Sequence, residues 1–574
     1  MKNFKRRCSV VLATIVAMGT ITSLTACGGG GGGGRDVIVQ DGKTVNVKVF
    51  KRGYGADWVY ELKKNFEKAY ADEGYKLNIL TPSPDIQGDV VYTEMAMGVE
   101  NSGIDLYITQ GSADMMGERG TYGVLAEDIR ETVFNQKAIG YDGVEEDLTV
   151  GEKLNGDLEK WLCDSTGVMY GFAWAGSVDG LVVNTRKLAK YGLALPVTTN
   201  QFFDCVDKIY TGYNGIENSE KSGTYPITTS ASGNYVNDGF AAWQRQYDME
   251  EYEKFWSMQE TVDGQKVDMT QNGYEVFKSD AIQSGLEKVY RYLDIYTSNY
   301  GSTTQSLDQA QASIMKDKNG AVFMLNGDWF LNEVKLNYSN ALNDITFIKT
   351  PINSDLGIRL FGENSSYGLT AVKADELLAK ISVLSDENKE IAEIVQIVYE
   401  DMGITVSEED ALEVAEARNS FICVGLDHKA FITKNSPTKD VAELVLRMMA
   451  SDDFAATFSK YANVNSPYAT AENTTSQYEF VRAASKIALN KYAKIFVDAN
   501  CLGLRRKLSL TQMLPQSGMN LVSDIRSASA TMYDGAGHRL TGVTDSVYVT
   551  PANTLMMNNY NYAKDNWATW IKRA

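Results

Sequence analysis

Short apolar segments alternate with longer amphipathic segments early in the chain, and this alternation limits the possible folds more than any other feature. Residues 44–50, 76–80 and 104–109 have the composition of strands, whereas residues 57–72 and 89–98 have the periodicity of helices. This order is typical of α/β layers. The sequence therefore predicts an α/β fold that begins with a βαβαβ unit.

The loops after the first and third predicted strands are candidates for a binding site, because ligands of open α/β sheets bind beyond the carboxyl ends of the strands. The candidate residues are Tyr54, Asp57 and Trp58 in the first of these loops, and Gln110, Ser112 and Asp114 in the second. Trp58 has an alternative role as a core residue, because large aromatic side chains are mostly buried.

The N-terminal segment has the features of a secretory signal peptide. Four basic residues within the first seven positions precede an apolar run over residues 10–21, and no acidic residue occurs before Asp36. A membrane-spanning helix needs roughly 20 apolar residues, so this run is too short to span a membrane. We interpret residues 1–26 as a signal peptide.

The signal ends in Leu24-Thr25-Ala26-Cys27, which resembles a bacterial lipobox. The resemblance implies that cleavage precedes Cys27 and that its thiol carries a diacylglycerol, which holds a protein stably at a membrane. Seven glycines follow and form a flexible tether, so residues 27–43 are expected to join the anchor to the fold. The expected location is the extracellular face of the cell membrane. The alternative is an ordinary signal followed by a chance cysteine.

The chain is acidic, with a formal net charge of −19, and loss of residues 1–26 makes it more acidic because that segment carries only basic charges. A strongly negative protein is repelled by nucleic acid and by anionic lipid. We therefore expect no nucleic-acid partner, and membrane contact only through the lipid anchor.

Cysteine and histidine offer little material for a metal site or a catalytic centre. His428 and His538 are the two histidines, and the C-x-x-C, G-x-S-x-G, H-E-x-x-H and G-x-x-x-x-G-K-[ST] motifs are absent from the sequence. Cys163 and Cys205 lie far apart, as small buried hydrophobes do. We expect neither metal nor cofactor, and no enzymatic activity.

Several segments, in their order and spacing, resemble the family 1 extracellular solute-binding proteins, which are the sugar-binding receptors of ABC importers of the maltose-binding type. The first is Tyr170-Gly-Phe-Ala-Trp-Ala-Gly-Ser-Val-Asp-Gly-Leu-Val-Val-Asn-Thr-Arg186, followed by a helix over residues 201–210. The second and more specific is Lys318-Asn-Gly-Ala-Val-Phe-Met-Leu-Asn-Gly-Asp-Trp-Phe-Leu-Asn-Glu-Val334, a strand, turn and helix. Residues 105–131 and 431–451 extend the resemblance over about residues 44–470. Val183-Asn-Thr-Arg186 departs mildly from the usual Tyr-Asn-Lys.

This resemblance implies two α/β lobes that close on a ligand about a hinge near residues 178–180. One lobe is expected to comprise residues 44–178 plus 360–460, and the other residues 180–356 plus 465–574. A helical stretch at about residues 375–418 is expected to interrupt the first lobe after a strand at residues 368–372. After about residue 470 the sequence holds no further family motif.

The resemblance also implies a sugar site centred on Trp329, whose flat ring can stack on the apolar face of a sugar. The other expected ligand-binding residues offer hydrogen bonds or further rings: Asn326 and Asp328 beside Trp329, Trp174 and Asp179 near the lobe crossing, and Asn364, Ser365 and Tyr367 on the rim. As alternatives, Trp329 and Trp174 could be core residues, and Asp179 and Asp328 could be the carboxylate pair of a glycoside hydrolase.

Three functions remain open from the sequence. The first is capture of a carbohydrate, expected to be an oligosaccharide, by a monomeric receptor that delivers it to the permease subunits of an ABC transporter. The second is capture of another solute, such as a peptide, a polyamine or an organophosphate, because a fold does not determine a function. The third is a surface enzyme that cleaves polysaccharides.

Overall fold

The structure is a computed structural model. It describes residues 36–51, 53–84, 86–118, 120–154, 158–214, 224–230, 235–300, 305–423, 428–497, 503–508 and 546–572. The predicted signal peptide, Cys27 and the glycine tether lie outside the described residues. Within the described part of the chain, no helix is both long enough and apolar enough to cross a membrane.

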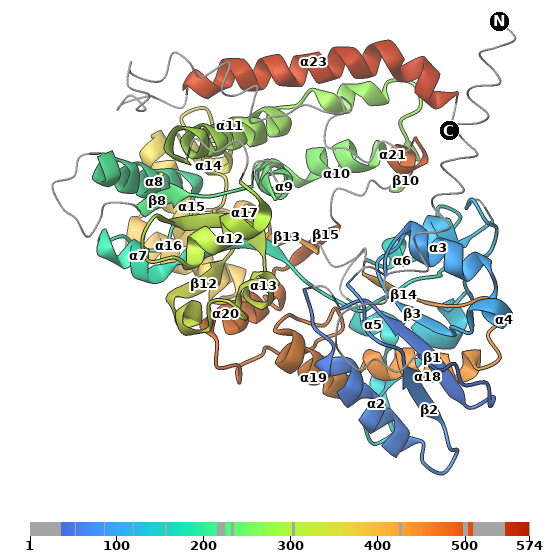
Figure 1. Ribbon diagram of the computed structural model, residues 1–574. Coiled ribbons are helices and arrows are strands. Elements are labelled where there is room, and N and C mark those ends of the chain that lie inside the picture. The colour runs from blue at the N-terminus through green and yellow to red at the C-terminus, as the bar shows by residue number, and fades with distance from the viewer. Residues whose placement is uncertain are drawn as a thin grey trace, which may run out of the picture. The chain divides into compact units, whose positions relative to one another are not determined.

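The first sheet has five strands in the order β2-β1-β3-β14-β6 (Figure 1). Their bounds are β1 Thr44–Val49, β2 Lys76–Ile79, β3 Leu106–Ile108, β6 Phe172–Ala173 and β14 Lys429–Ile432. β1 pairs in parallel with β2 and β3, and β14 pairs antiparallel with β3 and β6. The predicted βαβαβ unit is confirmed, because α2 (Asp57–Ala69) and α3 (Asp89–Ala96) connect these first three strands.

Helices cover the first sheet with apolar stripes that the sequence periodicity dictates. In α2, Trp58, Val59, Leu62 and Phe66 recur on one helix face and are all buried. α18 (Lys439–Met449) and α19 (Asp452–Ala462) pack in the same core, and α19 begins where the Ser451 hydroxyl accepts a hydrogen bond from the backbone of Phe454. This capped helix places Phe454 and Phe458 against α2.

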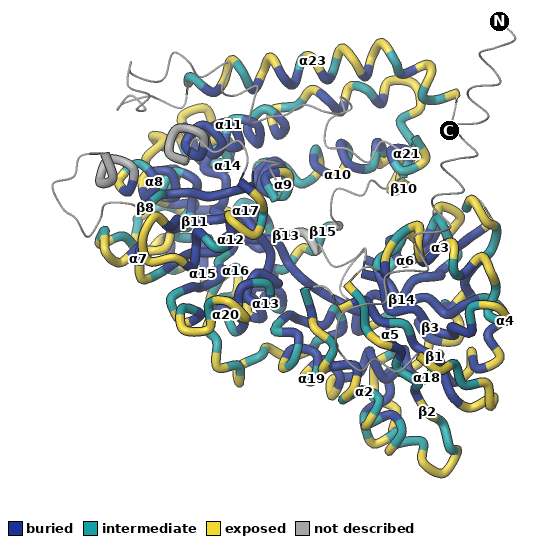
Figure 2. The backbone as a smooth tube through the Cα atoms, in the orientation of Figure 1, coloured by how far each residue is buried: buried dark blue, intermediate teal, exposed yellow. Residues whose placement is uncertain are grey.

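The second sheet has four strands in the order β12-β7-β11-β8. Their bounds are β7 Asp179–Asn184, β8 Thr224–Ile227, β11 Gly320–Gly327 and β12 Ile345–Ile348. Every residue of β7 and β11 is buried, as expected for central strands covered on both faces, and the tube in Figure 2 is dark blue at β11. The predicted strand, turn and helix at residues 318–334 are confirmed by β11 and α13 (Phe330–Val334).

Long helices pack against the second sheet and form a separate core. They include α8 Thr199–Asn214, α9 Val236–Tyr247, α10 Met249–Ser257, α11 Asp280–Tyr300 and the C-terminal α23 Ser546–Ile571. A hairpin of β9 (Gln259–Val262) and β10 (Gln265–Asp268) follows α10. The short helix α21 (Gly503–Lys507) adds Leu504 to the same core.

Consecutive elements repeatedly belong to different sheets, which divides the fold into two lobes. β6 ends at Ala173 in the first sheet, and β7 begins at Asp179 in the second. β13 (Ser420–Cys423) contacts β7 and α9, whereas the next strand, β14, joins the first sheet. α19 packs on α2, but α20 (Glu479–Ala488) packs on β12. The α/β fold with two lobes is thus the observed architecture.

Residues between β12 and β13 form a helical layer: α14 (Ser354–Phe361), α15 (Ala371–Asp386), α16 (Ile391–Met402) and α17 (Glu408–Arg418). The predicted strand at residues 368–372 is wrong. α15 already begins at Ala371, where Thr370 caps it by accepting a hydrogen bond from the Lys373 backbone. Residues 368–370 precede this helix, and of them Leu369 forms only an isolated bridge with Gly362.

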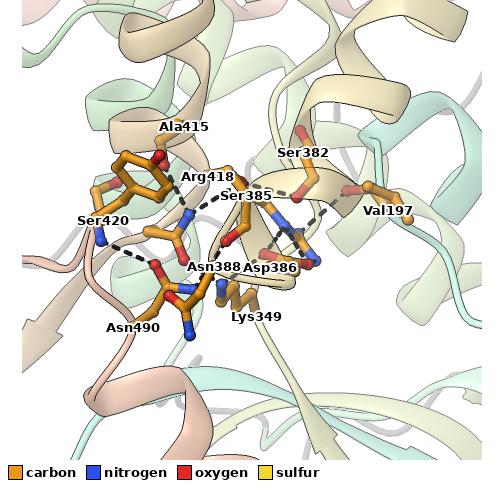
Figure 3. A network of polar contacts seen from close by, with 12 residues as sticks. Val197, Lys349, Ser382, Ser385, Asp386, Asn388, Ala415, Arg418, Ser420 and Asn490 are labelled. Atoms are coloured by element: carbon orange, nitrogen blue, oxygen red, sulfur yellow. Dashed lines mark hydrogen bonds and ion pairs between the residues drawn. The ribbon is translucent and has the colours of Figure 1, made fainter. Parts of the chain in front are cut away.

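This helical layer makes polar contacts with the second lobe, whereas the sequence predicted that it would interrupt the first lobe. Asp386 on α15 pairs with Lys349, the residue after β12, at 2.5 Å, and with Arg418 on α17 at 2.9 Å (Figure 3). Arg418 also donates to the carbonyl oxygens of Val197 and Thr350. The layer follows β12 without returning to the first sheet, and further polar contacts join it to Lys288 of α11 and to Lys494 of β15 (Lys494–Val497).

Candidate functional site

Aromatic side chains from several strand ends meet at one edge of the first sheet. Tyr54 follows β1, Trp174 follows β6, and His428 directly precedes β14. The ring centre of Tyr54 lies 5.1 Å from Trp174 and 5.0 Å from His428, both edge-on, and Phe458 of α19 stacks 6.2 Å from Tyr54. Because β14 runs antiparallel to β3 and β6, its beginning lies at their carboxyl ends, where the sequence predicted the site.

Hydrogen bonds hold this aromatic cluster in place. The Trp174 indole donates to the backbone oxygen of Thr109 at 2.8 Å. The side-chain nitrogen of Gln110 lies 3.1 Å from Nε2 of His428. Gln110 was predicted at this edge from its position after the third strand, whereas His428 was missed, although its position immediately before a strand was a usable signal.

Trp58 and Trp174 are packed as core residues in this conformation. Their rings stack 5.6 Å apart with an angle of 18° between the planes, and their exposed fractions are 0% and 1%. A ligand can therefore touch either indole only after a change of conformation. The role of these two residues in binding stays a prediction.

Trp329 lies in the turn between β11 and α13, and its ring packs into the core of the first lobe. Its exposed fraction is 6%, and its indole donates to the Tyr235 hydroxyl at 3.3 Å. The sequence Asn326-Gly327-Asp328-Trp329 determines this position. A Cβ atom on Gly327 would lie 1.8 Å from the Trp329 ring, so only glycine lets the ring fold back on the strand end.

Asp328 is fully buried beside Trp329, and its backbone N–H donates to the oxygen of Val178 at 3.1 Å. Neither carboxylate oxygen has a partner with hydrogen-bond geometry. Burial raises the pKa of Asp328 to about 8, although the nearby Ser177 hydroxyl partly opposes this. Ser177 in turn lies 3.1 Å from the Tyr54 hydroxyl, so Tyr54, Ser177 and Asp328 form one polar path among the aromatic rings.

The polar neighbours of Trp329 on the two central strands are buried as well. Asn326 accepts a hydrogen bond from the Gly327 backbone at 2.7 Å, and Asp179 lies opposite Gly327 in the register of β7 and β11. The exposed fractions are 2% for Asn326 and 5% for Asp179. The structure therefore brings Tyr54, Trp58, Gln110 and Trp174 together in one group, and Asp179, Asn326, Asp328 and Trp329 together in a second.

Three candidates in the strand-end loops have other surroundings. Asp57 is exposed at the start of α2, where its charge opposes the lowering of the Lys335 pKa by burial. Ser112 is exposed, and its backbone donates to the Tyr92 hydroxyl at 2.7 Å. Asp114 accepts from the Ser165 backbone at 2.7 Å and forms an ion pair with Arg506 of α21.

The structure does not bring Asn364, Ser365 and Tyr367 to the other candidates. They lie in the turn between α14 and α15, where the Tyr367 hydroxyl donates to Asp410 at 2.5 Å and Ser365 donates to the Gly362 oxygen. Their expected place on the rim depended on a strand that returns to the first sheet after residue 367. That strand is absent from the described residues, because the chain continues into the helical layer.

No group of three or more histidine, cysteine, aspartate or glutamate side chains within the described ranges could hold a metal ion. The two groups of candidate residues combine aromatic faces with the carboxyl groups of Asp179 and Asp328, the Tyr54 hydroxyl and the amides of Gln110 and Asn326. Such a set can stack on an apolar ring face and exchange hydrogen bonds with hydroxyl groups.

Sequence comparison gives no relative: no family model matches the chain, and no curated protein matches it. Solved structures do match. The bacterial solute receptor AcbH, which has an exclusive substrate preference for b-D-galactopyranose, aligns with a TM-score of 0.50 and 9% identity, over 91% of this chain and 100% of that chain.

Apo RafE from Streptococcus pneumoniae aligns with a TM-score of 0.49 and 12% identity, over 92% of this chain and 100% of that one. A chitin oligosaccharide binding protein has the same score and identity, over 90% and 99%. From the match to AcbH, together with the two sheets and the crossings between them, the chain has the two-lobe α/β fold of the bacterial solute receptors.

Proposed function

We propose that this protein is a carbohydrate receptor that captures its ligand outside the cell and delivers it to the permease subunits of an ABC transporter. The observation that carries the proposal is the polar path from Tyr54 through Ser177 to Asp328, which connects the ring pair of Tyr54 and Trp174 with the turn that holds Trp329. Flat rings next to hydrogen-bonding groups are the two elements that recognition of a sugar requires. The match to AcbH, itself a receptor for a sugar, supports the same class of ligand.

Binding without catalysis is the simpler use of these groups. A glycoside hydrolase needs one carboxylic acid to donate a proton and a second carboxylate to assist, on opposite sides of the scissile bond. Asp328 is buried in the turn before Trp329, near the Ser177 hydroxyl, which suits a hydrogen bond to a ligand hydroxyl. We therefore propose that the protein is not an enzyme.

The lipid anchor belongs to the same proposal and depends on the sequence at Cys27. A receptor held at the membrane by a flexible tether stays near its permease, which raises the local concentration of the docking partner. The glycine tether can provide this freedom because glycine-rich chains behave as flexible coils.

A ligand screen by thermal unfolding tests the function. A ligand that binds only the folded state at about 100 times its Kd stabilises it by about 2.7 kcal/mol, so the unfolding temperature rises. We expect mono- or oligosaccharides to raise it, and peptides, polyamines and organophosphates to leave it unchanged. Calorimetry then gives the affinity of each hit, and sugar analysis after incubation tests for cleavage. Stabilisation by a non-sugar solute alone, or turnover of a glycan, would contradict the proposal.

A further inference from the structure

The helix α21 carries Arg505, Arg506 and Lys507 in succession, and these side chains contact different parts of the fold. Arg505 is fully buried on the second lobe, where it donates to the Phe255 oxygen at 2.6 Å. Its guanidinium group lies 4.2 Å from the centre of the Phe255 ring. Lys507 pairs with Asp268 of the β9–β10 hairpin at 2.7 Å. These contacts, together with the buried Leu504, fix α21 to the second lobe.

Arg506 extends in the other direction, to the first lobe. Its Nε forms an ion pair with Asp114, which lies in the loop after β3, and its Nη2 donates to the Cys163 oxygen at 3.1 Å. The guanidinium group lies 5.6 Å from the centre of the Trp161 ring. Trp161 and Cys163 belong to the same core as β1 and α2. The Arg506 side chain thus joins the two lobes outside the backbone crossings.

The conformation that contains this contact covers the candidate site. Trp174, Asp328 and Trp329 have exposed fractions of 1%, 0% and 6%. Asp114, which the strand-end position makes a candidate for ligand contact, has one carboxylate oxygen on the Ser165 backbone and the other on Arg506. Because Trp329 follows a strand of the second sheet and packs into the core of the first lobe, a ligand that reaches its ring must first separate the lobes, and separation breaks the contacts of Arg506 with the first lobe.

We propose that Arg506 is an interlobe clasp, which holds the protein in the conformation with a covered site, and that the clasp must open before ligand enters. The ion pair suits this role because 14% of the Arg506 side chain and 33% of the Asp114 side chain are exposed. Because both side chains are partly exposed, water can solvate each charge when the pair separates. Separation of a fully buried pair would instead leave a buried charge without a partner and would strongly destabilise the protein. Opening also frees the Asp114 carboxylate oxygen that Arg506 contacts in the loop after β3. This inference goes beyond the proposed function, because it concerns the conformation of the chain whatever it binds.

Small-angle scattering and hydrogen exchange of the purified full chain, without added ligand, test the clasp. We expect Arg506→Ala and Asp114→Asn to increase the radius of gyration and to accelerate amide exchange in residues 330–334. The double variant should show no larger change than either single variant, because both remove the same contact. Lys507→Gln is the matched control: it removes a neighbouring charge whose partner lies on the same lobe, and it should behave as the parent.

Two results would overturn the proposal. One is a radius and an exchange rate that equal those of the parent in both Arg506→Ala and Asp114→Asn. The other is an equal increase in Lys507→Gln, which would show general loosening of α21. If Arg506→Ala does not fold, the near-isosteric Asp114→Asn decides the question alone. Since no ligand is added, failure to bind any carbohydrate would refute the proposed function and leave the clasp result standing.

Discussion

The Trp329 indole donates a hydrogen bond to the Tyr235 hydroxyl at 3.3 Å, and the two ring centres lie 5.5 Å apart. Tyr235 itself has a backbone φ of +65°, a conformation that non-glycine residues rarely adopt. A strained residue that orients an aromatic ring is a feature expected at a binding site rather than in an ordinary core. The contact with Tyr235 therefore supports the proposal that the packed Trp329 ring also belongs to the binding site.

Trp329→Ala is expected to reduce both stability and affinity. The side chain is 6% exposed in a packed core, so its removal should lower the free energy of unfolding by about 3 kcal/mol. If the ring also stacks on sugar, binding should weaken by about 2–4 kcal/mol, as for other aromatic hot spots. Chemical denaturation and calorimetry measure the two effects separately. Tyr235→Phe, which loses only a hydroxyl, is the control and should change each value by about 1 kcal/mol or less. Unchanged affinity in a destabilised Trp329→Ala protein would restrict Trp329 to a core role.

Gly327→Ala is expected to displace the Trp329 ring. The added Cβ would lie 1.8 Å from the ring, which is far inside van der Waals contact, so the indole must leave its position. Overpacking of this kind costs about 1–3 kcal/mol, and sugar affinity should fall with it. In a Trp329→Ala background the obstacle is gone, so Gly327→Ala should then be nearly neutral. An equal cost in both backgrounds, measured by denaturation, would show that the strand end and not the ring requires glycine.

Asp328 should make the folded state less stable as the pH rises. Burial raises its pKa to about 8 from an ordinary value of 3.8, so the folded protein retains a proton that the unfolded chain releases. The associated stability is fully present below pH 4 and is lost as the pH rises through 8. Asp328→Asn, which has no such proton, should be more stable than the parent at pH 8, and the difference should close toward pH 4. Unfolding temperatures across this range measure it, and parallel curves for the two proteins would contradict the assignment.

Cys27→Ser tests the predicted anchor. Without the thiol no diacylglycerol can be attached, so the protein should appear in the medium or remain uncut, still folded. Cell fractionation and lipid labelling in the host measure this, and Cys205→Ser is the control because Cys205 is a buried residue of the second lobe. Membrane association and lipid label equal to those of the parent in Cys27→Ser would contradict the lipobox interpretation.

The sequence predicted those parts of the fold in which local pattern and tertiary structure agree. The first βαβαβ unit is one example, because the apolar periodicity of α2 fits only a helix that covers a sheet. The turn at Trp329 is another, because only glycine at position 327 leaves room for the ring. The helical layer shows where prediction of the fold from the sequence fails. Its helices are visible in the sequence, but the choice of partner depends on buried side chains such as Asp386 and Arg418, which are distant in sequence from Lys349 and Val197.

From the sequence, the candidate site was predictable only for residues that directly follow a strand of the first sheet. Tyr54 and Gln110 lie at one edge because parallel strands bring their carboxyl ends together, and that rule can be applied to a sequence alone, whereas Trp174 was selected only from the family resemblance. The pairing of Asp114 with Arg506, 392 residues away, has no local signal. Ser177 was missed because an isolated hydroxyl in a loop carries no pattern, whereas the position of His428 immediately before β14 was a signal that went unused.

Substitution of Asp386 should lower the free energy of unfolding more than substitution of any other residue in the polar network of Figure 3. Burial raises its pKa, but the charges of Arg418 and Lys349 outweigh burial and hold the pKa below its ordinary value. Burial also lowers the pKa of Lys349 to about 8, so this lysine depends on Asp386 to remain charged. Asp386→Asn leaves the Arg418 guanidinium and the Lys349 amine, with exposed fractions of 5% and 8%, without their shared carboxylate, and this should cost about 3 kcal/mol of unfolding free energy.

A matched control separates this network from ordinary ion pairs on the same helix. Lys373 and Glu376 of α15 also pair, at 2.7 Å, but their side chains are 59% and 50% exposed. Lys373→Gln should therefore change stability by less than about 0.5 kcal/mol. Because the Asp386 pKa is depressed, its contribution should be present above the unfolded pKa of about 4 and should fall as acid protonates it. Denaturation at neutral and at acidic pH measures both variants. If Asp386→Asn costs no more than Lys373→Gln at neutral pH, the helical layer is held by its apolar core alone.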